Sequence, residues 1–286
     1  MRFRPLITSV TRIAVIAGII STALLGVKAA SATPSRVASI SQAQQIGWGL
    51  DAPDALVANN GELWIANYSA NQLVVVSETN GSLIRIISDA SYQISNPVAM
   101  VANNGEIWVA NRGNSSITVI NLTTGSLVAV LSGSDFGLCQ PSAVTADTSG
   151  VYVVNQCGGT LLSRIDPATK AISGSVATRL VDPSFLNFRG DGIATDGTNL
   201  WIDGTRGSYL LRVRLSDLSL EKQYKFDGSY RELSSISSPI TCFKGYIWIP
   251  GVATGIVGFD PKAQRATANG SIAYGFRSAF ATSQSL

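Results

Sequence analysis

A fifteen-residue segment recurs along this chain, and that repeat is the feature that most constrains its fold. PDALVANNGELWIAN at residues 53–67 returns as PVAMVANNGEIWVAN at 97–111 and, in looser form, as PSAVTADTSGVYVVN at 141–155. The offset is 44 residues both times. Two further copies keep the pattern but lose the final asparagine: GDGIATDGTNLWIDG from Gly190 and PITCFKGYIWIPG from Pro239. The chain therefore contains five related units.

Each unit has the pattern of four short strands joined by tight turns. In the second unit, Asn103-Asn104-Gly105 and Thr123-Thr124-Gly125 have the composition of hairpin turns, because these residues tolerate positive φ angles. The expected strands of that unit are 98–102, 106–111, 116–121 and 127–131. Four strands per period of about 40–50 residues are typical of a β-propeller, whereas β-helix coils are shorter. We predict an all-β fold, a β-propeller of four-stranded antiparallel blades.

The sequence predicts five full blades and a partial sixth unit that closes the ring. After the fifth repeat, Ser278–Thr282 resembles the first strand of another unit. Residues 33–50 include RVASIS, which could supply one or two strands to pair with the C-terminal segment. Closure removes the unpaired edges of an open ring. A truncated sequence is the alternative.

One large aromatic residue occupies the same place in every unit, on the expected second strand. These residues are Trp64, Trp108, Tyr152, Trp201 and Trp248. A large ring at this place can fill the wedge between neighbouring blades, where their faces are buried. We therefore interpret the five aromatics as packing residues rather than as a ligand cage.

Residues 1–32 have the pattern of a secretory signal peptide. Arg2, Arg4 and Arg12 precede an apolar run over residues 13–27, and Ala30-Ser31-Ala32 supplies small residues for cleavage. A membrane anchor is the alternative, but this run is shorter than the roughly 20 residues that span a bilayer. We expect a single propeller domain over 33–286, exported to the periplasm, cell surface or medium, with no membrane insertion after cleavage.

The charge of the mature chain argues against a nucleic acid partner. The whole chain has 21 Lys+Arg and 18 Asp+Glu. Arg2, Arg4, Arg12 and Lys28 leave with the signal, so 21 − 4 = 17 basic residues face 18 acidic ones. A chain so close to neutral offers no electrostatic attraction to nucleic acid or anionic lipid. We expect it to be monomeric.

The stretch IWVANRGNSSITVINLTTGSLVAVLSG, residues 107–133, resembles the YVTN type of β-propeller repeat. LSRIDPATKAI, residues 162–172, is similar to the NHL-like and streptogramin-lyase-like propellers. The resemblance covers residues 53–177 and weakens in the last two units. It implies a propeller, but such families include surface proteins, binding scaffolds and a few enzymes, so it names no function.

The chain contains no histidine. Resemblance to streptogramin lyases implies a histidine acid or base and a bound magnesium ion, and this chain cannot supply the first. The same absence removes Ser-His-Asp and Cys-His catalysis and the commonest zinc ligand. We therefore predict no catalytic residue, no metal site and no cofactor. A lyase or lactone hydrolase that uses carboxylates around a divalent cation is the alternative.

Propeller ligands usually gather at the face formed by the loops after the second and fourth strands of each blade, which we call the loop face. The repeated Asn67, Asn111 and Asn155 end second strands, where their amides can bond turn backbone, so we interpret them as structural. The residues that follow them differ from unit to unit, as a specific binding face requires. The predicted ligand-binding residues are Tyr68, Arg112, Gln156, Asp191, Asp203 and Arg206.

Asp203 is the most unusual of these residues. It stands where other units have Ala66, Ala110, Val154 and Pro250, so it is expected to lie partly between blades. A buried carboxylate needs a partner. Arg206, Arg189 and Arg212 are candidates for a structural ion pair, and Asp203 with Asp191 and Arg206 is the best polar cluster of a ligand site.

The three cysteines have different expected roles. Cys139 precedes the third unit and Cys157 follows its second strand, so both fall at the same end of one sheet and can form a disulfide. Cys242 lies on a first strand and is interpreted as a small buried apolar residue. The resulting hypothesis is an exported binding scaffold that takes a protein, peptide or glycan at its loop face.

Overall fold

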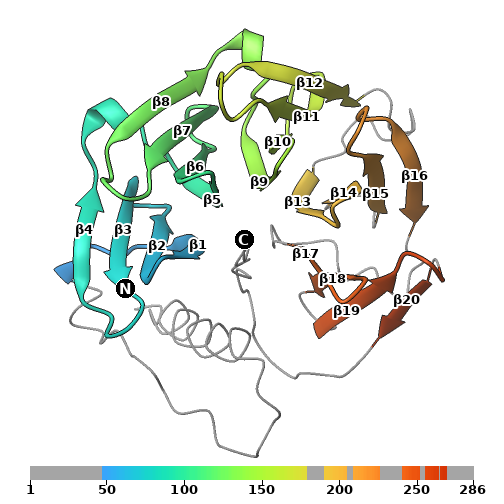
Figure 1. Cartoon of the computed structure of the whole chain (residues 1–286), viewed down its shortest axis with the longest axis horizontal. Coiled ribbons are helices and arrows are strands. Elements are labelled where there is room, and N and C mark those ends of the chain that lie inside the picture. The colour runs from blue at the N-terminus through green and yellow to red at the C-terminus, as the bar shows by residue number, and fades with distance from the viewer. Residues whose placement is uncertain are drawn as a thin grey trace, which may run out of the picture.

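The computed structural model describes residues 47–178, 190–204, 209–225, 240–251, 255–263 and 265–268. Within these ranges the chain forms five four-stranded antiparallel sheets, each with its strands in chain order. Figure 1 shows these sheets, blades 1–5, arranged around a common centre. The predicted propeller of four-stranded blades is confirmed. The predicted signal peptide, Arg206, Arg189 and the expected closing strand at Ser278–Thr282 lie outside the described residues.

The strands have the following bounds. Blade 1 contains β1 (Pro53–Asn59), β2 (Glu62–Asn67), β3 (Gln72–Ser77) and β4 (Leu83–Ile87). Blade 2 contains β5 (Pro97–Asn103), β6 (Glu106–Asn111), β7 (Ser116–Asn121) and β8 (Leu127–Ser132). Blade 3 contains β9 (Pro141–Asp147), β10 (Gly150–Asn155), β11 (Thr160–Ile165) and β12 (Ile172–Ala177).

The last two blades are built in the same order. Blade 4 contains β13 (Gly190–Thr195), β14 (Asn199–Gly204), β15 (Tyr209–Arg214) and β16 (Leu220–Lys225). Blade 5 contains β17 (Thr241–Phe243), β18 (Tyr246–Gly251), β19 (Gly255–Asp260) and β20 (Arg265–Ala268). Short 3-10 turns, η1 (Ala90–Tyr92) and η2 (Ser134–Phe136), precede blades 2 and 3.

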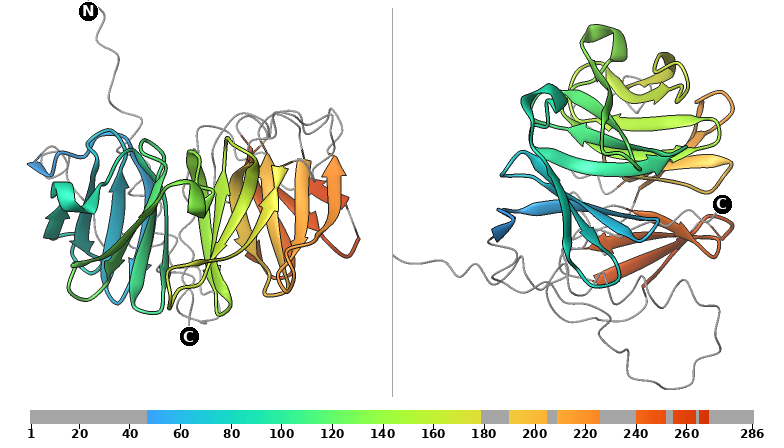
Figure 2. Two further views of the ribbon diagram at one scale, coloured as in Figure 1. Left: turned by 90° about the horizontal axis from the view of Figure 1, so that it is seen from above. Right: turned by 60° about the vertical axis from the view of Figure 1, so that its left-hand side comes forward.

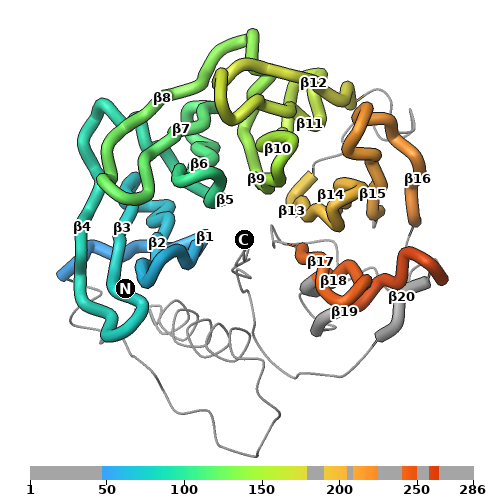
Figure 3. Tube along the Cα trace, in the orientation of Figure 1, coloured from blue at the N-terminus to red at the C-terminus, as the bar shows by residue number. Residues whose placement is uncertain are grey.

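The first strand of each blade lies nearest the centre and the fourth lies at the rim, as the chain trace shows (Figure 3). The strands run between two opposite faces of the ring (Figure 2). One face carries the turns between first and second strands, such as Asn60-Gly61 and Asn104-Gly105, whose residues all have positive φ. Such turns match the twist of the paired strands. The other face is the loop face.

The blades are held together by apolar clusters between neighbouring sheets. Trp64, Trp108, Tyr152 and Trp201 are each 0% exposed. Each packs with residues of the following blade, as Trp108 does with Val151 and Val153 of β10. The predicted packing role of these four aromatics is confirmed. The fifth, Trp248, lies on the last described blade and is partly exposed.

Basic side chains cover the buried indoles of blades 1, 2 and 4 at the face opposite the loop face. Arg85 of β4 lies over the Trp64 ring and pairs with Glu62 at 2.7 Å. Lys170 of blade 3 lies over the Trp108 ring and pairs with Glu106 of blade 2 at 2.6 Å. The second pair therefore joins two blades by charge and by a cation–π contact.

Candidate functional site

A buried asparagine fixes the loop face in each of the first three blades. The amide oxygen of each accepts a hydrogen bond from the backbone N–H of the residue sixteen positions earlier, in the segment that leads into the first strand of the same blade. The three bonds join Asp51 to Asn67 (2.7 Å), Ser95 to Asn111 (3.2 Å) and Cys139 to Asn155 (3.0 Å). All three asparagines are at most 2% exposed. Their predicted structural role is confirmed.

The residues that follow these asparagines are anchored through their backbone. The N–H of Tyr68 donates to the Ala52 carbonyl at 3.2 Å, and the N–H of Arg112 donates to the Asn96 carbonyl at 3.1 Å. In blade 3 the N–H of Gln156 instead donates to Cys139, also at 3.1 Å. The three side chains therefore leave from nearly equivalent, fixed positions on the loop face.

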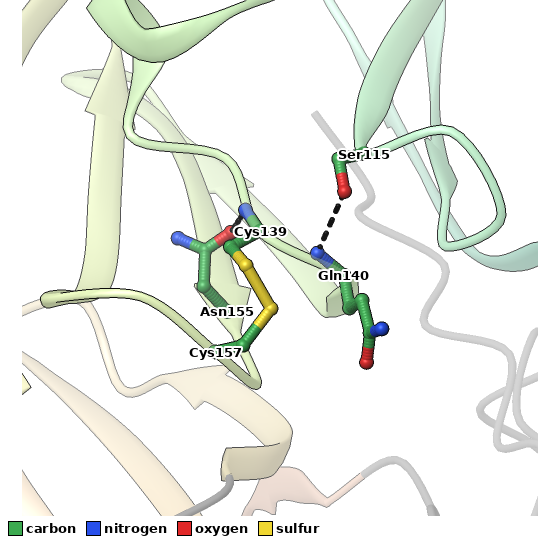
Figure 4. The surroundings of a disulfide bond; sticks show 5 residues. All are labelled: Ser115, Cys139, Gln140, Asn155 and Cys157. Atoms are coloured by element: carbon green, nitrogen blue, oxygen red, sulfur yellow. Dashed lines mark hydrogen bonds between the residues drawn. A yellow bond between two sulfur atoms is a disulfide. The ribbon is translucent and has the colours of Figure 1, made fainter.

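A disulfide replaces a backbone hydrogen bond in the third blade. In blades 1 and 2 the N–H of the next residue donates back across the same two segments, from Ser69 to Asp51 at 3.2 Å and from Gly113 to Ser95 at 3.0 Å. The residues 44 positions further along are Cys157 and Cys139, which are bonded through their sulfur atoms with their Cα atoms 5.2 Å apart (Figure 4). The structure thus contains the expected bridge.

Hydrogen bonds also join the loop face from blade to blade. The Asn96 N–H donates to the Asn71 side chain of blade 1 at 2.7 Å. The Gln140 N–H donates to the Ser115 hydroxyl of blade 2 at 3.0 Å (Figure 4). The Gln156 side chain of blade 3 donates to Asp191 of β13 at 2.8 Å. The loop face is therefore a continuous frame across four blades.

The structure separates the predicted binding residues into two groups. Tyr68 and Arg112 are partly exposed on blades 1 and 2. Gln156 and Asp191 are 9% and 5% exposed and bond each other, and Asp203 lies beside them on β14. The pair of Gln156 and Asp191 was not predicted from the sequence, because the two residues lie 35 positions apart on different blades.

Asp203 occupies an apolar position. It pairs with Gly192 across β13 and β14, in the register that the first three blades give to an apolar residue: Ala66, Ala110 and Val154. Its carboxyl Oδ1 is buried and accepts no hydrogen bond within the described ranges. Burial and then the negative charge of Asp191 raise the pKa of Asp203 from 3.8 to about 8, against opposing backbone hydrogen bonds from Gly192 and Asp203 itself.

A bulge aims Asp191 at its neighbours. The register of β13 shifts between Gly190 and Gly192, so Asp191 is the extra residue of the strand. Blades 1 and 2 have the same shift after Pro53 and Pro97. Bulges re-aim a side chain and are frequent next to functional sites. Gly190 is required here, because a Cβ atom on it would lie 2.4 Å from a Val154 methyl.

Two other polar side chains, Arg212 and Cys242, are engaged away from Asp203. Arg212, a candidate partner of Asp203, pairs with Glu221 at 2.9 Å and lies over the Trp201 ring. Cys242 packs against the cluster between blades 4 and 5, and burial, followed by the charge of Asp196, raises its thiol pKa to about 12. Such a thiol is a poor nucleophile at neutral pH, in agreement with the packing role expected for Cys242.

The described residues hold no group of three or more acidic or cysteine side chains placed to share a metal ion. Among them there is also no helix of the length and apolar character that a bilayer crossing needs. A cation at Asp191 and Asp203 would therefore require further oxygen ligands. The amide oxygen of Gln156, whose side chain bonds Asp191, is one candidate. That oxygen is buried and accepts no hydrogen bond in the described part of the chain.

This chain is similar to known proteins in its fold. No protein-family model and no curated protein sequence matches the chain. A catalytically inactive virginiamycin B lyase from Staphylococcus aureus, solved with quinupristin, is 14% identical with a TM-score of 0.61, and the match covers 75% of this chain and 68% of that one.

Two further structures are similar over comparable lengths. The WD40 domain of Pan2 from Neurospora crassa is 14% identical with a TM-score of 0.55, covering 73% of this chain and 62% of that one. BamB from Moraxella catarrhalis is 13% identical with a TM-score of 0.50, covering 76% and 62%. The chain thus spans about two thirds of each of these proteins. At such identities the similarity shows the β-propeller fold.

Proposed function

We propose that the protein is an exported binding scaffold whose partner docks on the loop face at Tyr68 and Arg112. One observation carries this proposal: the same backbone hydrogen bond anchors both residues, although their side chains differ completely. Scaffolds that bind specifically combine a constant frame with side chains that vary at fixed positions.

The chemistry of the two side chains suits recognition of a protein or peptide. Tyrosine and arginine are enriched among the residues that dominate protein interfaces. Tyr68 and Arg112 are both partly exposed, and within the described ranges no carboxylate forms an ion pair with Arg112. Its guanidinium is therefore available to a carboxylate of the partner, which it can bind through two parallel hydrogen bonds.

The frame lowers the entropic cost of binding. The backbone of both loops is held by the buried asparagines, and the Asn96 side chain donates to the Tyr68 carbonyl at 3.3 Å. Little of this backbone has to be ordered when a partner arrives, so more of the contact free energy is retained as affinity. Glycans that present a carboxylate are the competing class of ligand.

Site-specific photo-crosslinking tests this proposal. A photoreactive amino acid is placed at position 68 or 112 in the full chain in its native cell, and at Ala168, an exposed turn residue of the opposite face, as control. We expect a discrete adduct from positions 68 and 112 and none from 168. Protease or glycosidase treatment of the adduct then separates a protein from a glycan. Equal adducts from all three positions would contradict the proposal.

A cation-dependent lyase or lactone hydrolase is the second candidate function. It is favoured by Asp191, Asp203 and the buried Gln156 oxygen, which together place acceptor groups at the boundary of blades 3 and 4. Oxygen ligands of this kind suit Ca²⁺ or Mg²⁺. If this candidate is right, either ion raises the melting temperature of the wild type, and Asp203→Asn abolishes the increase. No change in melting temperature with either ion would exclude it.

A further inference from the structure

The loop face of blade 1 carries an exposed carboxylate next to the predicted binding residues. Asp51 lies in the segment that leads into β1, and it is exposed. Its N–H donates to the Asn67 side chain at 2.7 Å, and its carbonyl accepts the N–H of Ser69 at 3.2 Å. Within the described ranges no cation forms an ion pair with the Asp51 carboxylate. Asp51 therefore presents a negative charge to solvent from a fixed backbone.

A series of hydrogen bonds orders Asp51, Tyr68 and Arg112 along the loop face. The N–H of Tyr68 donates at 3.2 Å to the carbonyl of Ala52, which directly follows Asp51 in the chain. The Tyr68 carbonyl accepts the side-chain amide of Asn96 at 3.3 Å, and the Asn96 carbonyl accepts the N–H of Arg112 at 3.1 Å. Tyr68 is thus bonded on one side to the segment of Asp51 and on the other, through Asn96 alone, to Arg112.

Close packing holds Asn96 in its place between the two blades. A Cβ atom on Gly113 would lie 2.6 Å from the Asn96 side-chain oxygen and 2.4 Å from the Ser95 hydroxyl. A larger residue at position 113 would therefore displace the Asn96 side chain. The Asn96 N–H also donates to the Asn71 side chain of blade 1 at 2.7 Å. Asn96 is anchored to both blades, so it sets the spacing of the two loops that carry the binding side chains.

The charge of the loop face indicates what a ligand has to bring. The described loop-face segments of blades 1–3 are 47–52, 68–71, 88–96, 112–115, 133–140 and 156–159. They contain three carboxylates, Asp51, Asp89 and Asp135, and one guanidinium, Arg112. An acidic glycan would meet Arg112, but the surrounding carboxylates would repel it. A ligand that carries charges of both signs complements this face better.

The Tyr68 side chain lies between the two charges and calls for a third group on the ligand. It is partly exposed, and an exposed phenol ring packs well against an apolar or aromatic side chain. A peptide supplies a base, an apolar group and an acid on one backbone. An acidic glycan supplies the acid but has no cation for Asp51.

We propose that the loop face of blades 1 and 2 binds an extended peptide that places a basic side chain at Asp51, an apolar side chain against Tyr68 and an acidic side chain at Arg112. This inference rests on the proposed binding function and names the class of its partner. Arg112 can hold the acid through two parallel hydrogen bonds, and Asp51 can accept from a lysine or an arginine. Because the frame fixes the order of the three groups, the ligand carries its charges at a constant spacing.

Selection from a phage-displayed library of short random peptides tests the proposal. The full exported protein is used as wild type, Asp51→Asn and Arg112→Gln. The wild type is expected to enrich peptides with a basic and an acidic residue at constant spacing around an apolar one. Asp51→Asn should lose only the enrichment of the basic residue, and Arg112→Gln only that of the acidic residue. The matched control is Asp135→Asn, which neutralises an exposed carboxylate of the same face and should select as the wild type does.

A selected peptide, made synthetically, gives the size of each contribution. Each of the two neutral substitutions is expected to weaken its binding about tenfold, since a hydrogen bond between charged groups is lost. Asp135→Asn should leave the affinity unchanged. All three variants should keep the melting temperature of the wild type, because the substituted side chains are at the surface and form no ion pair in the described part of the chain.

Three results would overturn the proposal: peptides selected without the charged pair, unchanged selection by Asp51→Asn or Arg112→Gln, and no enrichment by the wild type over Tyr68→Ala. Crosslinking from positions 68 and 112 separates this failure from that of the binding function. An adduct from these positions together with any of the three results removes the peptide and leaves the binding function standing. Loss of the adduct as well removes both.

Discussion

The first three blades and the last two are built on one strand pattern but end their second strands differently. Blades 1–3 end β2, β6 and β10 in a buried asparagine that holds the preceding connection, whereas blades 4 and 5 end β14 and β18 in Gly204 and Gly251. Blade 4 also replaces an apolar residue of β14 by Asp203. The strand pattern is therefore sufficient for a blade to form, whereas the buried asparagine is what fixes the loops of the loop face.

The same comparison extends to the aromatic residue of the second strand. Trp108 lies between two described blades and is 0% exposed, but Trp248 lies on the last described blade and is partly exposed. A packing residue contributes in proportion to the surface it buries. The two tryptophans should therefore differ in what they contribute to stability, although they occupy the same place in the repeat.

Trp108→Ala tests that difference and has the largest expected effect. Removing a fully buried large aromatic costs about 3–5 kcal/mol, and we expect a corresponding loss in the free energy of unfolding. Trp248→Ala should cost roughly half as much or less, because part of the ring remains in water. Urea unfolding measures both losses, provided that the slope of unfolding free energy against urea concentration is the same for the variants and the wild type. Equal losses would show that Trp248 is packed as tightly as Trp108.

Removing the disulfide tests the covalent link that is specific to blade 3. Cys139→Ser/Cys157→Ser replaces the bond that stands where blades 1 and 2 have a backbone hydrogen bond. A bond that closes a loop of this length stabilises by about 2–4 kcal/mol, so the variant should unfold at lower urea. A reductant should lower the midpoint of the wild type and leave that of the variant unchanged. An effect of the reductant on the variant would contradict this interpretation.

Asp203→Asn tests the carboxyl in blade 4 through its pH dependence. Because the folded protein raises the pKa of Asp203 from 3.8 to about 8, the folded state retains a proton that the unfolded state releases between these values. Stability from this group is complete below pH 4 and falls as the pH rises to about 8. The variant should match the wild type at pH 4 and be the more stable protein at pH 8.

Thermal unfolding across this pH range provides the measurement. Asp135→Asn is the control, since Asp135 is an exposed carboxylate of η2 far along the chain from blade 4. It should run parallel to the wild type at every pH. A variant at position 203 that keeps the full pH dependence would mean that another group carries it.

Much of the fold and part of the site could be predicted from the sequence, for physical reasons that particular residues show. The 44-residue offset predicts the blades, since each unit must bury the same faces. It also predicts the disulfide, because Cys139 and Cys157 fall at one end of one sheet. The contact of Gln156 with Asp191 could not be predicted, because it depends on a bulge and on the docking of two blades.

The exposure of the rim strands could not be predicted either. Leu83, Ile84 and Ile86 are apolar residues in a strand-forming stretch, and strand patterns alone indicate a buried position as readily as an exposed one. Only the sheet order places β4 at the edge of its sheet. Comparison of the repeat units likewise identified Asp203 as unusual but did not show that Gln156 of blade 3 lies beside it.

The smallest expected effect concerns the residue that precedes the first strand of each of the first three blades. Ala52, Asn96 and Gln140 all have left-handed backbone, with φ of 50°, 45° and 47°. Ala52 is the simplest to test, because its side chain has no hydrogen bond to lose. Ala52→Gly should stabilise the protein by about 0.5–1 kcal/mol, since a left-handed alanine is strained and glycine is not. The gain is expected only if the Tyr68 N–H keeps its bond to the residue 52 carbonyl.

Ala70→Gly, in the neighbouring loop at ordinary φ, should instead lose a few tenths of a kcal/mol through the greater freedom of the unfolded chain. Urea unfolding of the two variants shows whether each substitution raises or lowers the free energy of unfolding. A loss at both positions would show that the left-handed backbone at Ala52 does not strain the protein.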